Sequence, residues 1–256
     1  MALQLVFEEA GSGAPLLLLH GLFGSSTNWR SVARQLATSH RVISVNLRNH
    51  GASPWADSMS YVEMAGDVMA LIERLGLQRP AVVGHSMGGK TAMALALDHP
   101  GLLGRLVVVD IAPVRYADRL SSYARAMASI DTLAASSRAE VQRLLESTIP
   151  DAATAAFLVQ NLVHRNEHFD WRINLAAITA SMGELSGFPD GPAARCFPGP
   201  TTLIVGARSD YVSAEDRAVF RTHFPRLQVI EIAEAGHWVH ADRPAEFIAA
   251  LRGALA

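Results

Sequence analysis

Residues 81–97 read AVVGHSMGGKTAMALAL, and this stretch decides the fold. Its first residues, Ala81 to Gly84, form a short apolar run typical of a buried strand, and its last residues have the composition of a helix. The turn between them reads G-H-S-M-G, with a glycine two residues on either side of Ser86. So tight a turn brings strand and helix too close for a Cβ atom at either glycine. The stretch therefore predicts a strained strand-turn-helix unit that pushes Ser86 out at the carboxyl edge of a sheet.

Strand-like and helix-like patterns alternate along most of the remaining chain. Continuous apolar runs such as LLLL and LVVVD are expected where helices cover both faces of a sheet. The alternation predicts an α/β fold with a mainly parallel sheet flanked by helices. The expected strands are Leu3–Phe7, Leu16–His20, Val42–Asn46, Ala81–Gly84, Leu106–Asp110, Thr202–Gly206 and Gln228–Ile232. The expected helices are Trp29–Ala37, Tyr61–Leu75, Met87–Asp98, Ala214–Phe224 and Pro244–Leu251.

The pattern changes between Pro113 and Pro198, where strand-like runs vanish and Ala, Ser, Arg and Glu recur at helical spacing. The strand-helix series resumes immediately afterwards, so both ends of this stretch meet at the sheet edge. We expect residues 1–112 and 199–256 to form one α/β core. Residues 113–198 are expected to form an all-helical cap, or lid, inserted in the same domain.

Composition limits the function classes that need to be considered. The chain has 256 residues, of which 50% are hydrophobic and 18% charged, with a formal net charge of −2. That balance offers no basic surface for nucleic acid, and no apolar run is long enough for stable membrane insertion. The N-terminus carries Glu8 and Glu9 where a signal peptide needs apolar residues, and Cys196 is the single cysteine. These features predict a cytoplasmic protein.

The Ser86 turn is typical of an activated serine nucleophile. The N-terminus of the following helix supplies partial positive charge, and the Met87 N–H is free to donate to a developing oxyanion. An H-G loop, HGLF at residues 20–23, directly follows an early strand. A loop at that place supplies the second oxyanion N–H, here from Leu22 or Phe23.

A histidine follows the last expected strand, in the sequence EAGHW at residues 234–238. His237 would therefore lie on a loop at the same sheet edge as Ser86, where it could act as the general base. His240 is a weaker candidate for the base.

The same residues carry a rival motif, because 84–91 also spell G-x-x-x-x-G-K-T, the pattern of a P-loop. In that interpretation Lys90 and Thr91 would hold phosphate and Mg²⁺ in an NTPase. The strand ending at Asp110 would then resemble a Walker B strand. Three observations favour the serine: the H-G loop, the position of His237, and the interval of about 20 residues between Thr91 and Asp110, which leaves room for one helix only.

Over essentially its whole length the sequence resembles the α/β-hydrolase superfamily. It is most similar to a branch of small bacterial esterases and thioesterases marked by four motifs. Here these are R-N-H-G at 48–51, G-H-S-M-G-G-K at 84–90, D-I-A-P at 110–113 and G-H-W-V-H at 236–240. Many members of the superfamily carry D-x-R-G-H-G-x-S where this chain reads NLRNHGAS, which supports the narrower branch. The resemblance implies hydrolysis through an acyl-enzyme, without a cofactor.

The resemblance leaves two candidates for the acid that supports His237. In most of the superfamily an aspartate stands three residues after the glycine of the penultimate strand, which is Gly206 here. That position is Ser209, and Asp210 lies one place further on. In the resembled branch the acid ends the preceding strand, at the position of Asp110, with a serine at the position of Ser209. We favour Asp110 over Asp210.

These inferences predict a serine hydrolase that cleaves carboxylic esters or thioesters with Ser86, His237 and Asp110. The alternatives on the same fold are a lyase, a perhydrolase or a receptor with slow turnover. The acyl length, the leaving group and the oligomeric state stay open. The candidates for an apolar substrate pocket are Trp238, Phe157, Trp171 and Met182.

Three further groups have alternative interpretations. His164 and His168 stand four apart on an expected lid helix, a spacing that zinc sites use, but no third ligand accompanies them and we expect no metal. Lys90 and Arg48 could meet an anionic substrate group, although surface or helix-stabilising roles are commoner for such charges.

Overall fold

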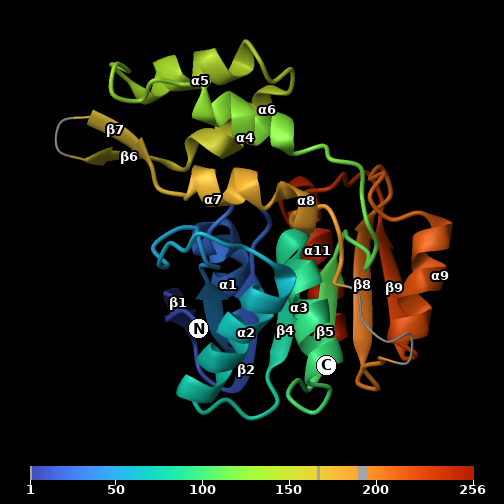
Figure 1. Cartoon of the computed structure of the whole chain (residues 1–256). Coiled ribbons are helices and arrows are strands. Elements are labelled where there is room, and N and C mark those ends of the chain that lie inside the picture. The colour runs from blue at the N-terminus through green and yellow to red at the C-terminus, as the bar shows by residue number, and fades with distance from the viewer. Residues whose placement is uncertain (1, 166–167, 190–194) are drawn as a thin grey trace.

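The computed structural model describes residues 2–165, 168–189 and 195–256, and its centre is one seven-stranded sheet (Figure 1). The strand order is β1-β3-β2-β4-β5-β8-β9, and every neighbouring pair is parallel except β1 with β3. This confirms the predicted fold class. The strands are β1 (Phe7–Ala10), β2 (Ala14–Leu19), β3 (His40–Val45), β4 (Ala81–His85), β5 (Arg105–Val109), β8 (Thr201–Gly206) and β9 (Leu227–Ile232).

Helices cover both faces of this sheet, so its central strands are buried on both sides. In β2, Leu17 and Leu19 pack into one core cluster, whereas Leu16 and Leu18 pack into the other, as the two-residue period of a strand requires. The helices are η1 (Ser26–Trp29), α1 (Arg30–Leu36), α2 (Tyr61–Arg74), α3 (Met87–Asp98), α9 (Ala214–His223), α10 (Val239–Asp242) and α11 (Pro244–Leu255). The apolar residues of α2, α3 and α9 belong to the first cluster, and those of α1 and α11 to the second.

The first strand differs from its prediction. We expected Leu3–Phe7, but the strand begins at Phe7. The preceding residues are held by single hydrogen bonds rather than by a ladder: Leu3 N–H donates to Asp67 Oδ1 (2.7 Å), and the Val6 carbonyl accepts from Asn46 N–H (2.9 Å). Apolar composition alone does not distinguish a paired strand from an extended segment that is held by single hydrogen bonds.

Between β5 and β8 the chain forms a separate layer over the carboxyl ends of the strands (Figure 1). Within it lies a departure from the all-helical prediction, since β6 and β7 pair as an antiparallel hairpin. His164 and His168 lie in these strands and not on a helix. The elements are α4 (Ser121–Ala128), α5 (Arg138–Glu146), α6 (Ala152–Val159), β6 (Leu162–Arg165), β7 (His168–Trp171), α7 (Leu175–Ala180) and α8 (Met182–Leu185). None of the helices described for this chain is long and apolar enough to cross a membrane.

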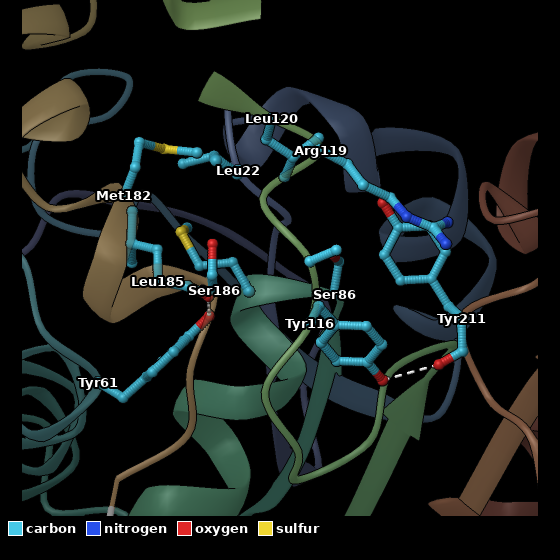
Figure 2. Close-up of a pocket in the computed structure, with 12 residues that line it drawn as sticks. Leu22, Tyr61, Ser86, Tyr116, Arg119, Leu120, Met182, Leu185, Ser186 and Tyr211 are labelled. Carbon is cyan, nitrogen blue, oxygen red and sulfur yellow. Dashed lines mark hydrogen bonds between the residues drawn. The ribbon is translucent and has the colours of Figure 1, made fainter. Parts of the chain in front are cut away.

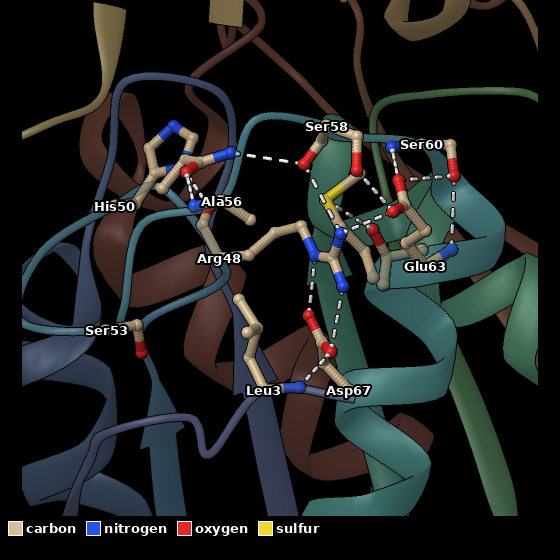
Figure 3. A network of polar contacts seen from close by, with 12 residues as sticks. Leu3, Arg48, His50, Ser53, Ala56, Ser58, Ser60, Glu63 and Asp67 are labelled. Atoms are coloured by element: carbon tan, nitrogen blue, oxygen red, sulfur yellow. Dashed lines mark hydrogen bonds and ion pairs between the residues drawn. The ribbon is translucent and has the colours of Figure 1, made fainter. Parts of the chain in front are cut away.

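The loop after β3 is fixed to α2 by a buried ion pair (Figure 3). The Arg48 guanidinium donates to both oxygens of Asp67, from Nε (2.7 Å) and Nη2 (3.0 Å). Its Nη1 also contacts Glu63 Oε1 at 2.9 Å. The side chains of Arg48 and Asp67 are 4% and 0% exposed, so Arg48 is committed to the scaffold and does not face a substrate.

This pair gives a first prediction. Asp67→Asn removes one charge from a buried pair and should lower the free energy of unfolding by about 3 kcal/mol, because it leaves the guanidinium partly uncompensated. Urea denaturation measures the change. The matched control is Glu9→Gln, which breaks the half-exposed Arg41–Glu9 pair and should cost less than about 1 kcal/mol. Equal losses in the two variants would contradict this account.

Candidate active site

Ser86 occupies the strained turn that the sequence predicts. Its φ is 52° and its ψ is −118°, a backbone conformation that residues with a Cβ rarely adopt. A Cβ on Gly84 would lie 2.2 Å from the Gly88 carbonyl oxygen, and one on Gly88 would lie 2.4 Å from the Leu19 carbonyl oxygen. The Ser86 N–H donates to the Val109 carbonyl (3.1 Å), which ties the turn to β5. The glycines are therefore required by close backbone contacts on both sides of the serine.

A pocket lies above Ser86, between the core and the layer that follows β5 (Figure 2). Most of its wall is apolar or aromatic, and three of the four tyrosines of the chain contribute to it. The lining residues are Leu22, Tyr61, Ser86, Met87, Tyr116, Ala117, Arg119, Leu120, Met182, Leu185, Ser186 and Tyr211.

Only one of the four residues expected in the pocket lines it. Met182 does so, but Trp171 is buried within the inserted layer, where its Nε1–H donates to the Met127 carbonyl (3.2 Å). Phe157 and Trp238 face each other with ring centroids 5.2 Å apart and join that layer to the core. The sequence does not show whether a large apolar side chain lines the pocket, packs inside the inserted layer or joins that layer to the core.

The His237 imidazole is held by Asp110. Its Nδ1 lies 2.7 Å from Asp110 Oδ2, and the carboxylate is fully buried. Asp110 also accepts hydrogen bonds from Gly206 N–H (3.1 Å, to Oδ1) and from the Ser209 hydroxyl. These bonds place the proton of the neutral ring on Nδ1 and leave Nε2 as the basic nitrogen.

The other candidate acid lies elsewhere. The side chain of Asp210 is 71% exposed and pairs with Arg119 Nη1 at 2.6 Å. Within the part of the chain that the structure describes, it forms no hydrogen bond or ion pair with His237.

Ser86 and His237 lie on neighbouring loops, joined by the residue that precedes the serine. His85 Nε2 donates to the His237 carbonyl (2.9 Å), and the two rings are 4.7 Å apart. Burial lowers the pKa of His85 well below its ordinary value, so this ring stays neutral. No hydrogen bond between the Ser86 hydroxyl and His237 is formed among the described residues. In ligand-free enzymes such bonds are often long and tighten when substrate binds.

Tyr211 is a site residue that the sequence analysis missed. Its ring stacks on the His237 imidazole with a centroid distance of 3.7 Å and an interplanar angle of 16°. The Tyr211 carbonyl accepts from the Tyr116 hydroxyl at 2.7 Å (Figure 2). The Tyr211 N–H donates to Ser209 Oγ at 3.2 Å. The imidazole is thus confined on one face by a ring that is itself anchored. Its proximity to Ser209 and Asp210 in the sequence was the one available signal.

Of the backbone amides that the sequence proposed for an oxyanion site, two are unpaired and a third is occupied. The N–H groups of Met87 and Leu22 have no acceptor within the described ranges, and both residues line the pocket. The Phe23 N–H, which the sequence left as an alternative to Leu22, donates to His50 Nε2 (3.2 Å) and is not available.

Lys90 and Thr91 are not arranged as a phosphate site. Lys90 is 1% exposed, and its Nζ donates to the carbonyls of Val114 (2.8 Å), Ser186 (3.3 Å) and Gly187. Burial lowers the pKa of Lys90 to about 7, with the nearby Arg115 as the second cause. Thr91 Oγ1 donates to the Met87 carbonyl of its own helix (3.0 Å). The P-loop interpretation is therefore wrong, because both side chains are already used inside the fold.

Two buried histidines hold the loop that carries Leu22. In each ring, Nδ1 donates to a carbonyl, that of Gly21 for His20 (2.8 Å) and that of Arg48 for His50 (2.9 Å). Each Nε2 accepts a backbone N–H, from Leu47 (3.0 Å) for His20 and from Phe23 (3.2 Å) for His50. A second proton would face another donor. Burial also lowers the pKa of His20 to about 3 and that of His50 to about 4.

Comparisons with known proteins agree with this fold. The sequence profile of the alpha/beta hydrolase fold matches residues 14–244. The chain is 39% identical over 251 residues to the sn-1-specific diacylglycerol lipase ABHD11 of Xenopus tropicalis, covering 95% of this chain and 78% of that protein. It is 33% identical over 246 residues to the esterase YbfF of Escherichia coli (strain K12), covering 96% and 94%. A solved structure of a marine microorganism esterase superposes with a TM-score of 0.96 at 35% identity, covering 98% and 99%.

The buried histidines generate a prediction for pH. Because their folded pKa values lie below the ordinary 6.5, the folded chain binds fewer protons than the unfolded chain between about pH 4 and 6.5. The free energy of unfolding should therefore fall as the pH is lowered from about 7 to about 5. In His50→Gln, whose amide oxygen can still accept the Phe23 N–H, the proton uptake on unfolding should be smaller by about one. Urea denaturation of the wild type and of His50→Gln at several pH values tests this. The same dependence of the unfolding free energy on pH in both proteins would contradict the prediction.

Proposed function

Because this chain belongs to the α/β-hydrolase fold family, we propose that it is a serine hydrolase that cleaves carboxylic esters through an acyl-enzyme on Ser86. The observation that carries the proposal is the convergence of three groups at one rim of the sheet. These are a serine on a strained turn, two unpaired backbone amides beside it, and an imidazole held by a buried carboxylate. Such an arrangement suits acyl transfer, in which one oxygen attacks and another gains charge.

In the proposed reaction, His237 Nε2 takes the Ser86 proton while Oγ forms a bond to the acyl carbon. The N–H groups of Met87 and Leu22 bind the oxyanion, a contribution of about 3 kcal/mol per donor in comparable sites. When the tetrahedral intermediate collapses, the bond to the alcohol oxygen breaks and His237 delivers its proton to that oxygen. Water then attacks the acyl-enzyme by the same steps, which restores the Ser86 hydroxyl.

Asp110 has two tasks in this scheme. Its hydrogen bond to Nδ1 keeps the lone pair of His237 on Nε2, and its charge stabilises the imidazolium that forms in each half-reaction. The stacked Tyr211 ring restricts the plane in which the imidazole can turn. The Ser86–His237 hydrogen bond is expected to form on substrate binding.

We infer an apolar acyl group for the substrate, because Leu22, Leu120, Met182 and Leu185 face the space above Ser86. Three of these residues belong to the layer of residues 113–198, which we treat as a lid on a core of residues 1–112 and 199–256. The relatives named above are an esterase and a lipase, which favours an oxygen ester over a thioester. Their names also favour a small-molecule substrate for this chain.

Ser86→Ala tests the nucleophile. We expect kcat on p-nitrophenyl acyl esters to fall by about 10⁴-fold or more, because no other group can form the acyl-enzyme. Turnover is measured across acyl lengths, with acyl-CoA esters in parallel to test thioesters. Many cycles per wild-type molecule would exclude a slow receptor, and analysis of the products would separate hydrolysis from lyase or perhydrolase chemistry. Full activity in Ser86→Ala would end the proposal.

A pair of variants tests the acid. Asp110→Asn should lower kcat by about 10⁴-fold, because an amide at this position favours the wrong histidine tautomer. Asp210→Asn breaks only an exposed pair with Arg119, so its kcat should stay within about threefold of wild type. The same ester series provides the measurement. An inactive Asp210→Asn beside an active Asp110→Asn would assign the role to the other carboxylate.

A further inference from the structure

Lys90 is a buried cation that the proposed reaction does not use. It lies one helical turn after the serine in α3, where its N–H donates to the Ser86 carbonyl (3.0 Å). Its ammonium has three donors, and the fold supplies three carbonyl acceptors, from Val114, Ser186 and Gly187. No carboxylate pairs with Lys90 anywhere in the described chain. In its charged form the side chain is therefore held by backbone carbonyls and by the rings near it, without a carboxylate.

The three carbonyls belong to the two segments that connect the lid to the core. Val114 follows β5, where the chain enters the lid, and Ser186 and Gly187 follow α8, where it leaves. The two segments also touch each other, because Tyr116 N–H donates to the Ser186 carbonyl (2.8 Å). Lys90 Nζ thus lies at the point where entry and exit meet.

The same contacts form part of the pocket wall. Lys90 Nζ lies 4.6 Å from the Tyr116 ring centroid and 5.5 Å from that of Tyr61, within the range of a cation–π interaction. Tyr61 also donates its hydroxyl to the Leu185 carbonyl (2.7 Å), beside Ser186. Four lining residues, Tyr61, Tyr116, Leu185 and Ser186, therefore lie in or next to the contacts of this ammonium. Figure 2 shows these four at the pocket.

An ammonium in this place is costly to desolvate, so a merely space-filling role would be served better by a methionine or leucine. The lysine, unlike an apolar side chain, fixes the relative positions of two segments, because three of their carbonyls must converge on its Nζ. We propose that Lys90 is a positioning residue that fixes both connections of the lid on α3 and thereby sets the acyl-binding wall above Ser86. This inference rests on the proposed function. It assigns Lys90 to the binding of the acyl chain and leaves the chemistry to Ser86.

Lys90→Met tests the inference, since methionine removes the donors but keeps an unbranched side chain. We expect KM for a hexanoyl ester to rise roughly tenfold, the scale of a lost apolar contact. On the acetyl ester, which scarcely reaches the wall, kcat should stay within about threefold. The rate at which a small fluorophosphonate labels Ser86 should be unchanged. Hydrogen–deuterium exchange at the Tyr116 amide should become faster, because its acceptor is no longer held.

Two further variants complete the design. Lys90→Gln keeps a donor group and should give a smaller change of the same kind, and it decides the matter if Lys90→Met does not fold. Arg41→Gln, which removes the half-exposed cation of the Arg41–Glu9 pair, should change neither KM nor exchange at Tyr116. Equal KM for all acyl lengths with unchanged Tyr116 exchange would overturn the inference. A fall of acetyl-ester kcat and of Ser86 labelling with unchanged KM would also overturn it. A wild-type chain that is not labelled at Ser86 would instead refute the proposed function, and the exchange measurement would still test Lys90.

Discussion

The close approach of strand β4, the Ser86 turn and helix α3 is the constraint on which the rest of the site depends. A Cβ at Gly88 would overlap the carbonyls of Leu19 and His20, so the end of β2 lies directly against the start of α3. This contact brings the loop that carries Leu22 beside the first amide of the helix, Met87. The distance between the two unpaired N–H groups is thus a property of backbone packing, and no side chain has to create it.

The histidines near the Ser86 turn are held in two different ways. The imidazoles of His20 and His50 must stay neutral, because each accepts one backbone N–H and donates to one carbonyl. His237 has a different environment, since a buried carboxylate lies 2.7 Å from its Nδ1 and its side chain is 22% exposed. The three histidines thus differ in the hydrogen-bond partners that the fold gives them.

The core could be predicted from the sequence because buried parallel strands and amphipathic helices leave strong local patterns. The Ser86 turn and the neighbourhood of His237 followed from the same patterns, and the proximity of Asp110 followed from the family resemblance. The pairing of β6 and β7 was not predicted, because each strand has four residues. That length is too short for an alternation of apolar and polar residues to be recognised. Tyr211 and the Phe23 amide escaped for another reason: ring stacking and the occupation of an N–H depend on contacts between distant segments.

The meeting of entry and exit at Lys90 has a consequence for how such proteins can diversify. The chain leaves the core and returns to it at adjacent points. The structure of the sheet therefore does not depend on the length or shape of the segment inserted between these points. A different segment could be spliced between these points with little entropic penalty and without moving Ser86 or His237. New ligand preferences could then arise by exchange of a module, while the reactive centre is inherited intact.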